Sequence, residues 1–284
     1  MRSTLVATAL TALATAGILA AVAPSASAAG TTGYNDWTCK PSAEHPEPVV
    51  LLHGLGANDS STYATLAPTL AAAGYCVYSQ TYGTTNFGPT VGGLAKIETS
   101  AGQVSSFVDK VLSSTGARKV DIVGHSEGTE VTAYYLKFLD GAAKVKNFVA
   151  LGPGYHGSTA QGILTLANET GITPILAAGG CESCQEFAPD STFITNMNAG
   201  GVAVARPKYT NIVTTLDEVI TPYTSGIIPG ANVTNIVLQD VCPADSSGHL
   251  GLTFDPNVFS LVLNALDPAH ARPITCQPFL GAGV

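Results

Sequence analysis

One serine in the sequence has the surroundings of a nucleophile. Ser126 lies in Gly-His-Ser-Glu-Gly at 124–128, after an apolar stretch at 120–123 that predicts a strand and before a helical pattern at about 128–139. Glycines around the serine permit a tight strand-to-helix turn that exposes the hydroxyl. The five-residue pattern is weak alone in a glycine-rich chain, but its place between strand and helix predicts a nucleophile elbow.

A serine hydroxyl needs a base to accept its proton, and that base needs a partner to fix its tautomer. In chains with such an elbow the acid and then the histidine follow the serine. We expect His249, in a loop-like stretch after the predicted strand at 235–238, to be the base. His270, in the C-terminal segment, is the alternative.

The expected acid is Asp217, which directly follows the predicted strand at 211–215. Asp240 follows the next strand and is the main alternative, but it comes only nine residues before His249 and would compete with it for one loop. Glu218 and Asp245 are weaker alternatives, and an ordinary solvated turn remains open for Asp217 itself.

A glycine-rich turn follows the first predicted strand, as His-Gly-Leu-Gly at 53–56. Acyl transfer develops negative charge on a carbonyl oxygen, which preorganised backbone N–H groups can stabilise. The expected donors are the N–H groups of Leu55 and of Glu127, the residue after the nucleophile. His53 and His125 are expected to pack or form hydrogen bonds beside the turn, without a chemical role.

The substrate pocket should lie near these turns, at the carboxyl ends of the strands. Ordinary core packing is the alternative for each candidate wall residue. The candidates are Tyr82, Phe87, Leu164, Val219, Ile220 and Leu250.

Short Val- and Ile-rich runs alternate with helical patterns along the chain. The runs at 49–52, 76–79, 120–123, 145–151, 211–215 and 235–238 predict buried strands, and the patterns from 97 to 112, from about 128 to 139 and from 256 to 266 predict helices. This alternation predicts an α/β fold with a mostly parallel sheet and helices on both faces. The Gly-, Thr- and Asn-rich stretch at 154–207 predicts a small cap-like excursion or pocket wall, although packing filler is also open.

The chain begins with a basic residue, an apolar Ala-rich run and Ala-Ser-Ala at 26–28. This pattern predicts a signal peptide at 1–28 and a secreted chain at 29–284 with one catalytic domain. A membrane anchor is the alternative for the apolar run. The formal net charge of −8 disfavours nucleic acid and anionic membrane as partners and suits a neutral substrate.

Six cysteines in an exported chain predict three disulfides. Sequence leaves many pairings open, and we favour the pairs that are adjacent in order. A zinc or redox site at 181–184 is the alternative, but no second ligand pair has the spacing that zinc requires. The favoured pairs are Cys39 with Cys76, Cys181 with Cys184, and Cys242 with Cys276.

The chain resembles the secreted actinobacterial lipases and esterases of the α/β-hydrolase superfamily. The resemblance rests on the segments 53–56, 124–128, 217–222 and 248–250, and so covers most of the mature chain. It implies that these segments supply oxyanion loop, nucleophile, acid and base in a lipase or carboxylesterase of the α/β-hydrolase fold with little or no lid. Some such enzymes also attack plant or synthetic polyesters, so a cutinase- or suberinase-like activity is an alternative.

The proposed chemistry uses only side-chain acid, base and nucleophile, so no metal or organic cofactor is expected. We expect a monomer without a stable membrane anchor. An amidase or peptidase on the same scaffold and a secreted, non-catalytic binding protein are remoter alternatives.

Overall fold

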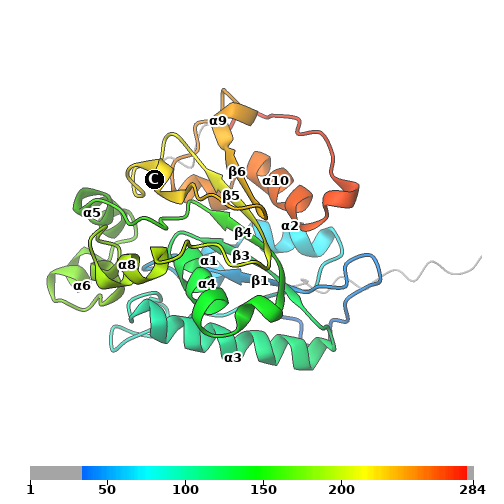
Figure 1. Ribbon diagram of the computed structural model, residues 1–284, viewed down its shortest axis with the longest axis horizontal. Coiled ribbons are helices and arrows are strands. Elements are labelled where there is room, and N and C mark those ends of the chain that lie inside the picture. The colour runs from blue at the N-terminus through cyan, green and yellow to red at the C-terminus, as the bar shows by residue number, and fades with distance from the viewer. Residues whose placement is uncertain (1–33, 280–284) are drawn as a thin grey trace, which may run out of the picture. The chain divides into compact units, whose positions relative to one another are not determined.

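A six-stranded sheet forms the centre of the computed structural model, which describes residues 34–279 (Figure 1). The internal contacts divide the chain after residue 30, and all features below belong to the unit Thr31–Val284. The predicted signal peptide at 1–28 lies outside the described residues. The strands are β1 (Val49–Leu52), β2 (Val77–Ser79), β3 (Val120–His125), β4 (Val145–Leu151), β5 (Lys208–Val213) and β6 (Val233–Val237).

The strands lie in the order β2-β1-β3-β4-β5-β6, and every neighbouring pair is parallel. The predicted parallel sheet with helices on both faces is therefore confirmed. The α-helices are α1 (Asp59–Thr62), α2 (Leu66–Ala72), α3 (Ile97–Thr115), α4 (Glu127–Phe138), α5 (Ala160–Glu169), α6 (Thr173–Ala177), α7 (Ser183–Glu186), α8 (Thr192–Asn198), α9 (Leu238–Val241) and α10 (Pro256–Leu266).

Each strand of the sheet contributes side chains to both faces, because successive residues point to opposite sides. One apolar cluster combines Val50 and Leu52 of β1 with helices α3 and α4. The other combines Val49 and Leu51 with helices α2 and α10. Figure 1 shows these helix pairs on opposite sides of the sheet. Burial on both faces explains why β1 is apolar at every position.

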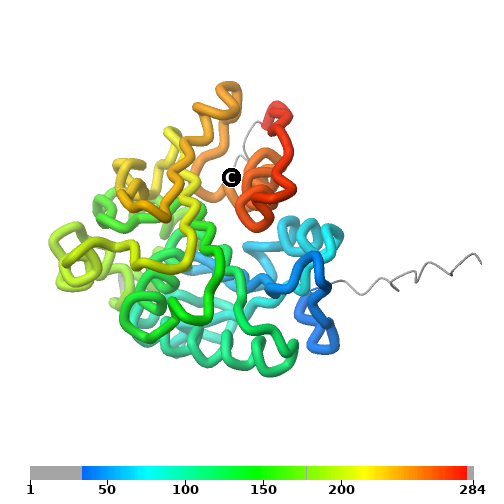
Figure 2. The backbone as a smooth tube through the Cα atoms, turned by 45° about the vertical axis from the view of Figure 1, so that its right-hand side comes forward, coloured from blue at the N-terminus to red at the C-terminus, as the bar shows by residue number. Residues whose placement is uncertain are grey.

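Helix α10 begins at Pro256, as the sequence pattern predicts, and the side chain of Asp255 accepts the N–H of Asn257 as its cap. The C-terminal segment returns to this helix (Figure 2), where Asn257 and Gln277 form two mutual hydrogen bonds. The predicted ranges for β5 and β6 lie a few residues too late. Leu238, assigned to a strand by its apolar character, instead begins α9.

The excursion at 154–207 contains no strand but four short helices, α5 to α8. Thr159 and Ser191 cap two of them by accepting the N–H groups of Gly162 and Ile194. The Gly-, Thr- and Asn-rich composition of this stretch does not predict these helices, whose local signals are the capping residues.

Three disulfides join Cys39 with Cys76, Cys181 with Cys184, and Cys242 with Cys276, the same pairs that the order of the cysteines favours. The structure therefore does not leave Cys181 and Cys184 as free thiol ligands. Among residues 34–279, no helix has both the length and the apolar character to cross a membrane.

The packing of Phe148, in β4, yields a prediction on stability. Phe148 has no exposed surface and packs edge-on against Tyr209. Phe148→Ala should lower the free energy of unfolding in urea by about 3–5 kcal/mol, because a cavity remains. Phe138→Ala is the control. The ring of Phe138 is 44% exposed, so the loss of unfolding free energy should be about 0.5 kcal/mol. Equal losses in the two variants would contradict the packing described here.

Candidate active site

The turn that carries Ser126 is tight and strained. Ser126 has a φ of 52°, a left-handed conformation that side chains rarely adopt, and its N–H donates to Leu151 O at 2.9 Å. A Cβ atom at Gly124 would lie 2.7 Å from Gly128 O, and one at Gly128 would collide with Leu52 O. The two glycines are therefore required by the close approach of helix α4 to strands β1 and β3.

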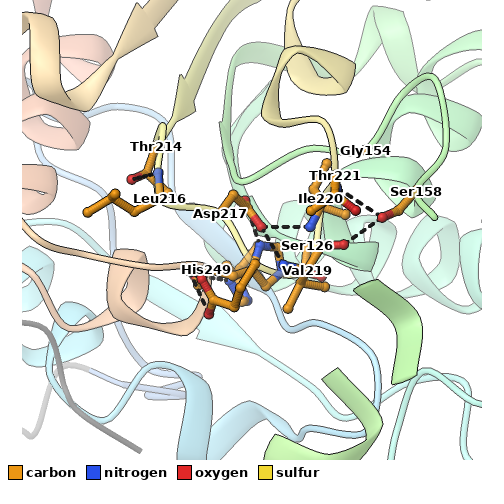
Figure 3. A network of polar contacts seen from close by, with 12 residues as sticks. Ser126, Gly154, Ser158, Thr214, Leu216, Asp217, Val219, Ile220, Thr221 and His249 are labelled. Carbon is orange, nitrogen blue, oxygen red and sulfur yellow. Dashed lines mark hydrogen bonds and ion pairs between the residues drawn. The ribbon is translucent and has the colours of Figure 1, made fainter. Parts of the chain in front are cut away.

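A buried carboxylate and a buried imidazole lie at the same edge of the sheet. His249 Nδ1 donates to Asp217 Oδ2 at 2.9 Å, and the two side chains are 0% and 2% exposed (Figure 3). The other oxygen of Asp217 accepts the N–H groups of Val219 at 3.0 Å and Ile220 at 2.6 Å. These bonds fix the carboxylate and leave Nε2 of the ring as an acceptor.

The ring of His249 lies over the segment that bonds to Ser126. A Cβ atom at Gly152, the residue after Leu151, would lie 3.0 Å from this ring. Among the described residues, the buried Nε2 atom has no hydrogen-bond partner. The structure thus brings the elbow serine and the His–Asp pair to one place (Figure 3). Within the described part of the chain, Nε2 accepts no hydrogen bond, from Ser126 or from any other residue.

Opposing influences act on the pKa of His249. Burial lowers the pKa, but the charge and hydrogen bond of Asp217 raise it, and Glu218 and Glu169 add to that effect. The net result is a pKa above the ordinary 6.5. Asp217 therefore stabilises the imidazolium that forms when the ring accepts a proton.

The alternative acids and base lie elsewhere. Asp240 is exposed on α9, and His270 is an exposed residue paired with Asp267 at 2.8 Å. Asp245 accepts the N–H of Ser247 and an N–H of Asn257. Glu218 contacts the backbone of His249, not its ring.

The Gly54–Leu55 turn lies against the nucleophile. A Cβ atom at Gly54 would be 2.9 Å from Ser126 Cβ, so only glycine fits there without displacement. Within the described residues, neither the N–H of Leu55 nor that of Glu127 donates a hydrogen bond. Two unsatisfied donors beside a serine are what an oxyanion site requires.

A second segment, 92–94, supports this turn. Gly56 N donates to Gly92 O at 2.9 Å, and Gly92 N donates to Ala57 O at 2.8 Å. The disulfide loop at 181–184 in turn holds this segment: Ser183 Oγ donates to Gly93 O at 2.5 Å, and Glu182 N donates to Leu94 O at 2.8 Å. The excursion is thus bonded to the segment behind the turn.

His53 of the glycine-rich turn and His125 of the nucleophile turn are both buried and neutral. Burial lowers the pKa of His53 to about 4 and that of His125 to about 3. The N–H of Tyr82 donates to His53 Nε2, so the proton lies on Nδ1, which donates to Gly54 O at 2.8 Å. His53 therefore fixes the turn that carries Leu55, and His125 Nε2 bonds to His249 O at 3.1 Å.

A pocket of about 320 Å³ opens at Ser126. Of the six predicted wall residues, Leu250 lines it and the others do not. Tyr82, Val219 and Ile220 are buried in the core, whereas Phe87 and Leu164 are 38% and 46% exposed outside it. The wall consists of Gly54, Leu55, Gly56, Ala57, Asn58, Ser61, Thr62, His125, Ser126, Leu166, Thr170, Leu250, Thr253 and Phe254.

The wall includes residues that the sequence pattern does not indicate as pocket residues. They come from α1, from the end of α5 and from the segment after His249. Among the described residues, no Asp, Glu, Lys or Arg lines the pocket. In the part of the chain that the structure describes, no group of three or more His, Cys, Asp or Glu side chains could hold a metal ion.

Comparison with known proteins identifies a family and a fold. The family model described as Lipase (class 2) matches residues 46–258. Aspergillus fumigatus lipase B has a similar structure with a TM-score of 0.64 and 21% identity over 83% of this chain, which spans 56% of the length of that protein. The mature form of Bacillus licheniformis lipase BlEst2 gives 0.58 and 16% over 84% of this chain and 99% of its own length. At these identities the likeness concerns the fold, which is that of α/β-hydrolases.

Glu127 yields a prediction on stability. Neither carboxyl oxygen of this buried side chain has a partner among the described residues, and burial, with Glu130 and Glu186, raises its pKa well above the ordinary 4.5. Because the folded state holds a proton that the unfolded chain releases, stability falls as pH rises above 4.5 towards the folded-state pKa. Glu127→Gln should remove this dependence.

The free energy of unfolding in urea, measured between about pH 5 and 9, should therefore decline less steeply in Glu127→Gln than in the wild type. Any constant cost of the buried amide shifts the whole curve and leaves its slope unchanged. Parallel curves for wild type and Glu127→Gln would mean that Glu127 is not held neutral.

Proposed function

This chain belongs to the lipase class 2 family, and from that premise we propose that it is a secreted serine carboxylic-ester hydrolase that acts through an acyl-enzyme. The observation that carries the proposal is the buried hydrogen bond from His249 to Asp217 beside the strained turn of Ser126. The other ring nitrogen of His249, Nε2, has no hydrogen-bond partner among the described residues. Family membership makes the chain a lipase-type enzyme with an ester substrate. The site residues and the substrate class are the proposal.

In the first step His249 Nε2 accepts the proton of Ser126, and Oγ attacks the carbonyl carbon of the ester. Asp217 holds the proton on Nδ1 and stabilises the imidazolium. The oxygen of the tetrahedral intermediate accepts hydrogen bonds from the N–H groups of Leu55 and Glu127. The imidazolium then donates its proton to the departing alcohol, which leaves an acyl group on Ser126.

Deacylation repeats these steps with water. His249 removes a proton from the water molecule that attacks the acyl carbonyl, and Ser126 leaves with that proton. All proton transfers use one imidazole. The chemistry requires no metal or organic cofactor.

Neutral lipid esters are the proposed substrates. The uncharged wall of the pocket supports this class, because a charged substrate would lose its hydration there without an ionic partner. The three disulfides support secretion, since they persist in oxidising compartments. The monomeric state remains a prediction.

Ser126→Ala should reduce kcat on a soluble p-nitrophenyl ester by roughly a million-fold while the melting temperature changes little. The loss is large because no other group can form the acyl-enzyme. A fluorophosphonate probe should label the wild type and not the variant. A variant that retains wild-type turnover would assign the chemistry to another serine.

Asp217→Asn should reduce kcat by about 10⁴-fold, because the amide favours the wrong imidazole tautomer. Asp240→Asn is the matched control, since it removes an exposed carboxylate one strand away and should retain activity. If Asp240→Asn were the damaging change, the assignment of the acid would be wrong.

Substrate class is tested with matched esters and amides, triacylglycerols of several chain lengths and a polyester film. Faster cleavage of lipid esters than of amides is the expected result. Faster amide cleavage would favour a peptidase, and release of monomers from the film would extend the substrate range to polyesters.

A further inference from the structure

Two adjacent carboxylates bind one histidine at two different places. Asp217 accepts the ring Nδ1–H of His249, whereas Glu218 accepts the backbone N–H of His249 with both oxygens, each at 3.1 Å. Glu218 is partly buried and takes no part in the proton transfers described above. Its contact with His249 joins segments 31 residues apart in the sequence.

The residue before His249 provides the space for this contact. A Cβ atom at Gly248 would lie 2.5 Å from Glu218 Oε2 and 3.0 Å from the carboxyl carbon. Any other side chain at 248 would displace the carboxylate. Gly248 therefore has a specific reason to be glycine even though its φ is not in the left-handed region.

The turn that carries both carboxylates is fixed by its own hydrogen bonds. The N–H groups of Val219 and Ile220 bind Asp217 Oδ1, so the backbone that follows Glu218 is held relative to Asp217. The two carboxylates thus have a set separation. A histidine bound to both has its backbone and its ring fixed by one rigid turn.

On the basis of the proposed function of His249, we propose that Glu218 is a positioning residue: it holds the backbone of His249 so that Nε2 faces the hydroxyl of Ser126. An imidazole bound only through Nδ1 could still swing about that single hydrogen bond. A second attachment at the backbone removes this freedom, and a small misplacement of a reacting group is costly in rate.

Glu218 also adds charge near the ring. The titratable groups that face His249 are Asp217 and Glu218 on the turn after β5, Glu169 at the end of α5, Glu130 on α4 and His125 at the end of β3. Of the glutamates, Glu218 and Glu169 raise the pKa of His249. Positioning and charge are therefore two effects of Glu218 that substitutions can separate.

The test compares Glu218→Ala with Glu218→Gln. Alanine removes acceptor and charge, so kcat should fall by about 10- to 100-fold with little change in KM. Glutamine keeps one acceptor oxygen and should restore most of kcat. Because it lacks the negative charge, the pKa of His249 should fall, and the acidic limb of kcat/KM should move to lower pH.

Two further variants serve as controls. Glu169→Gln removes a nearby charge without touching the backbone of His249, so it should move the acidic limb in the same direction and leave kcat at the optimum unchanged. Asp240→Asn should change neither quantity. Gly248→Ala should resemble Glu218→Ala in kcat, because the added methyl group displaces the carboxylate.

An NMR titration of the His249 ring gives a readout that does not depend on turnover, and it also works in the Ser126→Ala background. A lower His249 pKa in Glu218→Gln is expected there too. If Glu218→Ala folds poorly, Gly248→Ala carries the test of positioning, because its methyl group displaces the carboxylate while the charge remains. Unchanged kcat in Glu218→Ala, or a loss of kcat in Glu218→Gln as large as that in Glu218→Ala, would overturn the inference.

Failure of the proposed function has a different outcome. A wild-type protein without ester hydrolysis, or an active Ser126→Ala variant, would overturn the role of the nucleophile and base. Ser126-dependent hydrolysis together with a silent Glu218 would leave that function intact and overturn only the positioning role.

Discussion

The hydrogen bond between Asp217 and His249 is the interaction on which the arrangement of the site depends. A carboxylate removed from water is costly unless its remaining lone pairs find donors, and the two backbone N–H groups of the same turn supply them. In such an environment the bond is stronger than it would be in water. The loop that carries His249 is therefore fixed by a contact that also sets the chemistry of the ring.

The parallel sheet supplies the frame in which this bond can form. Backbone hydrogen bonds continue across the carboxyl ends of β3, β4 and β5, from Ser126 N to Leu151 O and from Gly152 N to Ile212 O. The elbow and the segment before the acid turn are thereby tied to β4. Gly152, with a φ of 58°, leaves the space in which the imidazole of His249 lies.

The sequence was most informative where function imposes a local pattern. The turn around Ser126 needs glycines at set positions, and the cap of α10 needs Asp255 before Pro256, so these features are visible in a short window. Pocket walls are different, because the direction of a side chain depends on tertiary packing. Tyr82 was a reasonable candidate by position, yet its ring stacks on His53 and its hydroxyl bonds to the backbone of that residue.

From the sequence, Glu218 is only an alternative to Asp217 as the acid. Its contact with the His249 backbone could not be predicted, because it depends on how two loops approach each other. Gly248, next to His249, is the sequence feature that indicates a close approach at this point. Similarly, nothing local indicates that the carboxyl group of Glu127 is buried beside Gly93 without a hydrogen-bond partner among the described residues.

The bonds from the disulfide loop to Gly93 and Leu94 have a consequence for how such an enzyme can diversify. The excursion supplies Leu166 and Thr170 to the pocket, and the same excursion is bonded to the segment that supports the turn of Leu55, a proposed amide donor. In the proposed mechanism, selectivity for the acyl chain and stabilisation of the oxyanion are therefore coupled traits. Exchange of this region between homologous enzymes would transfer both together, so chimeras need junctions outside 92–94 as well as outside 154–207.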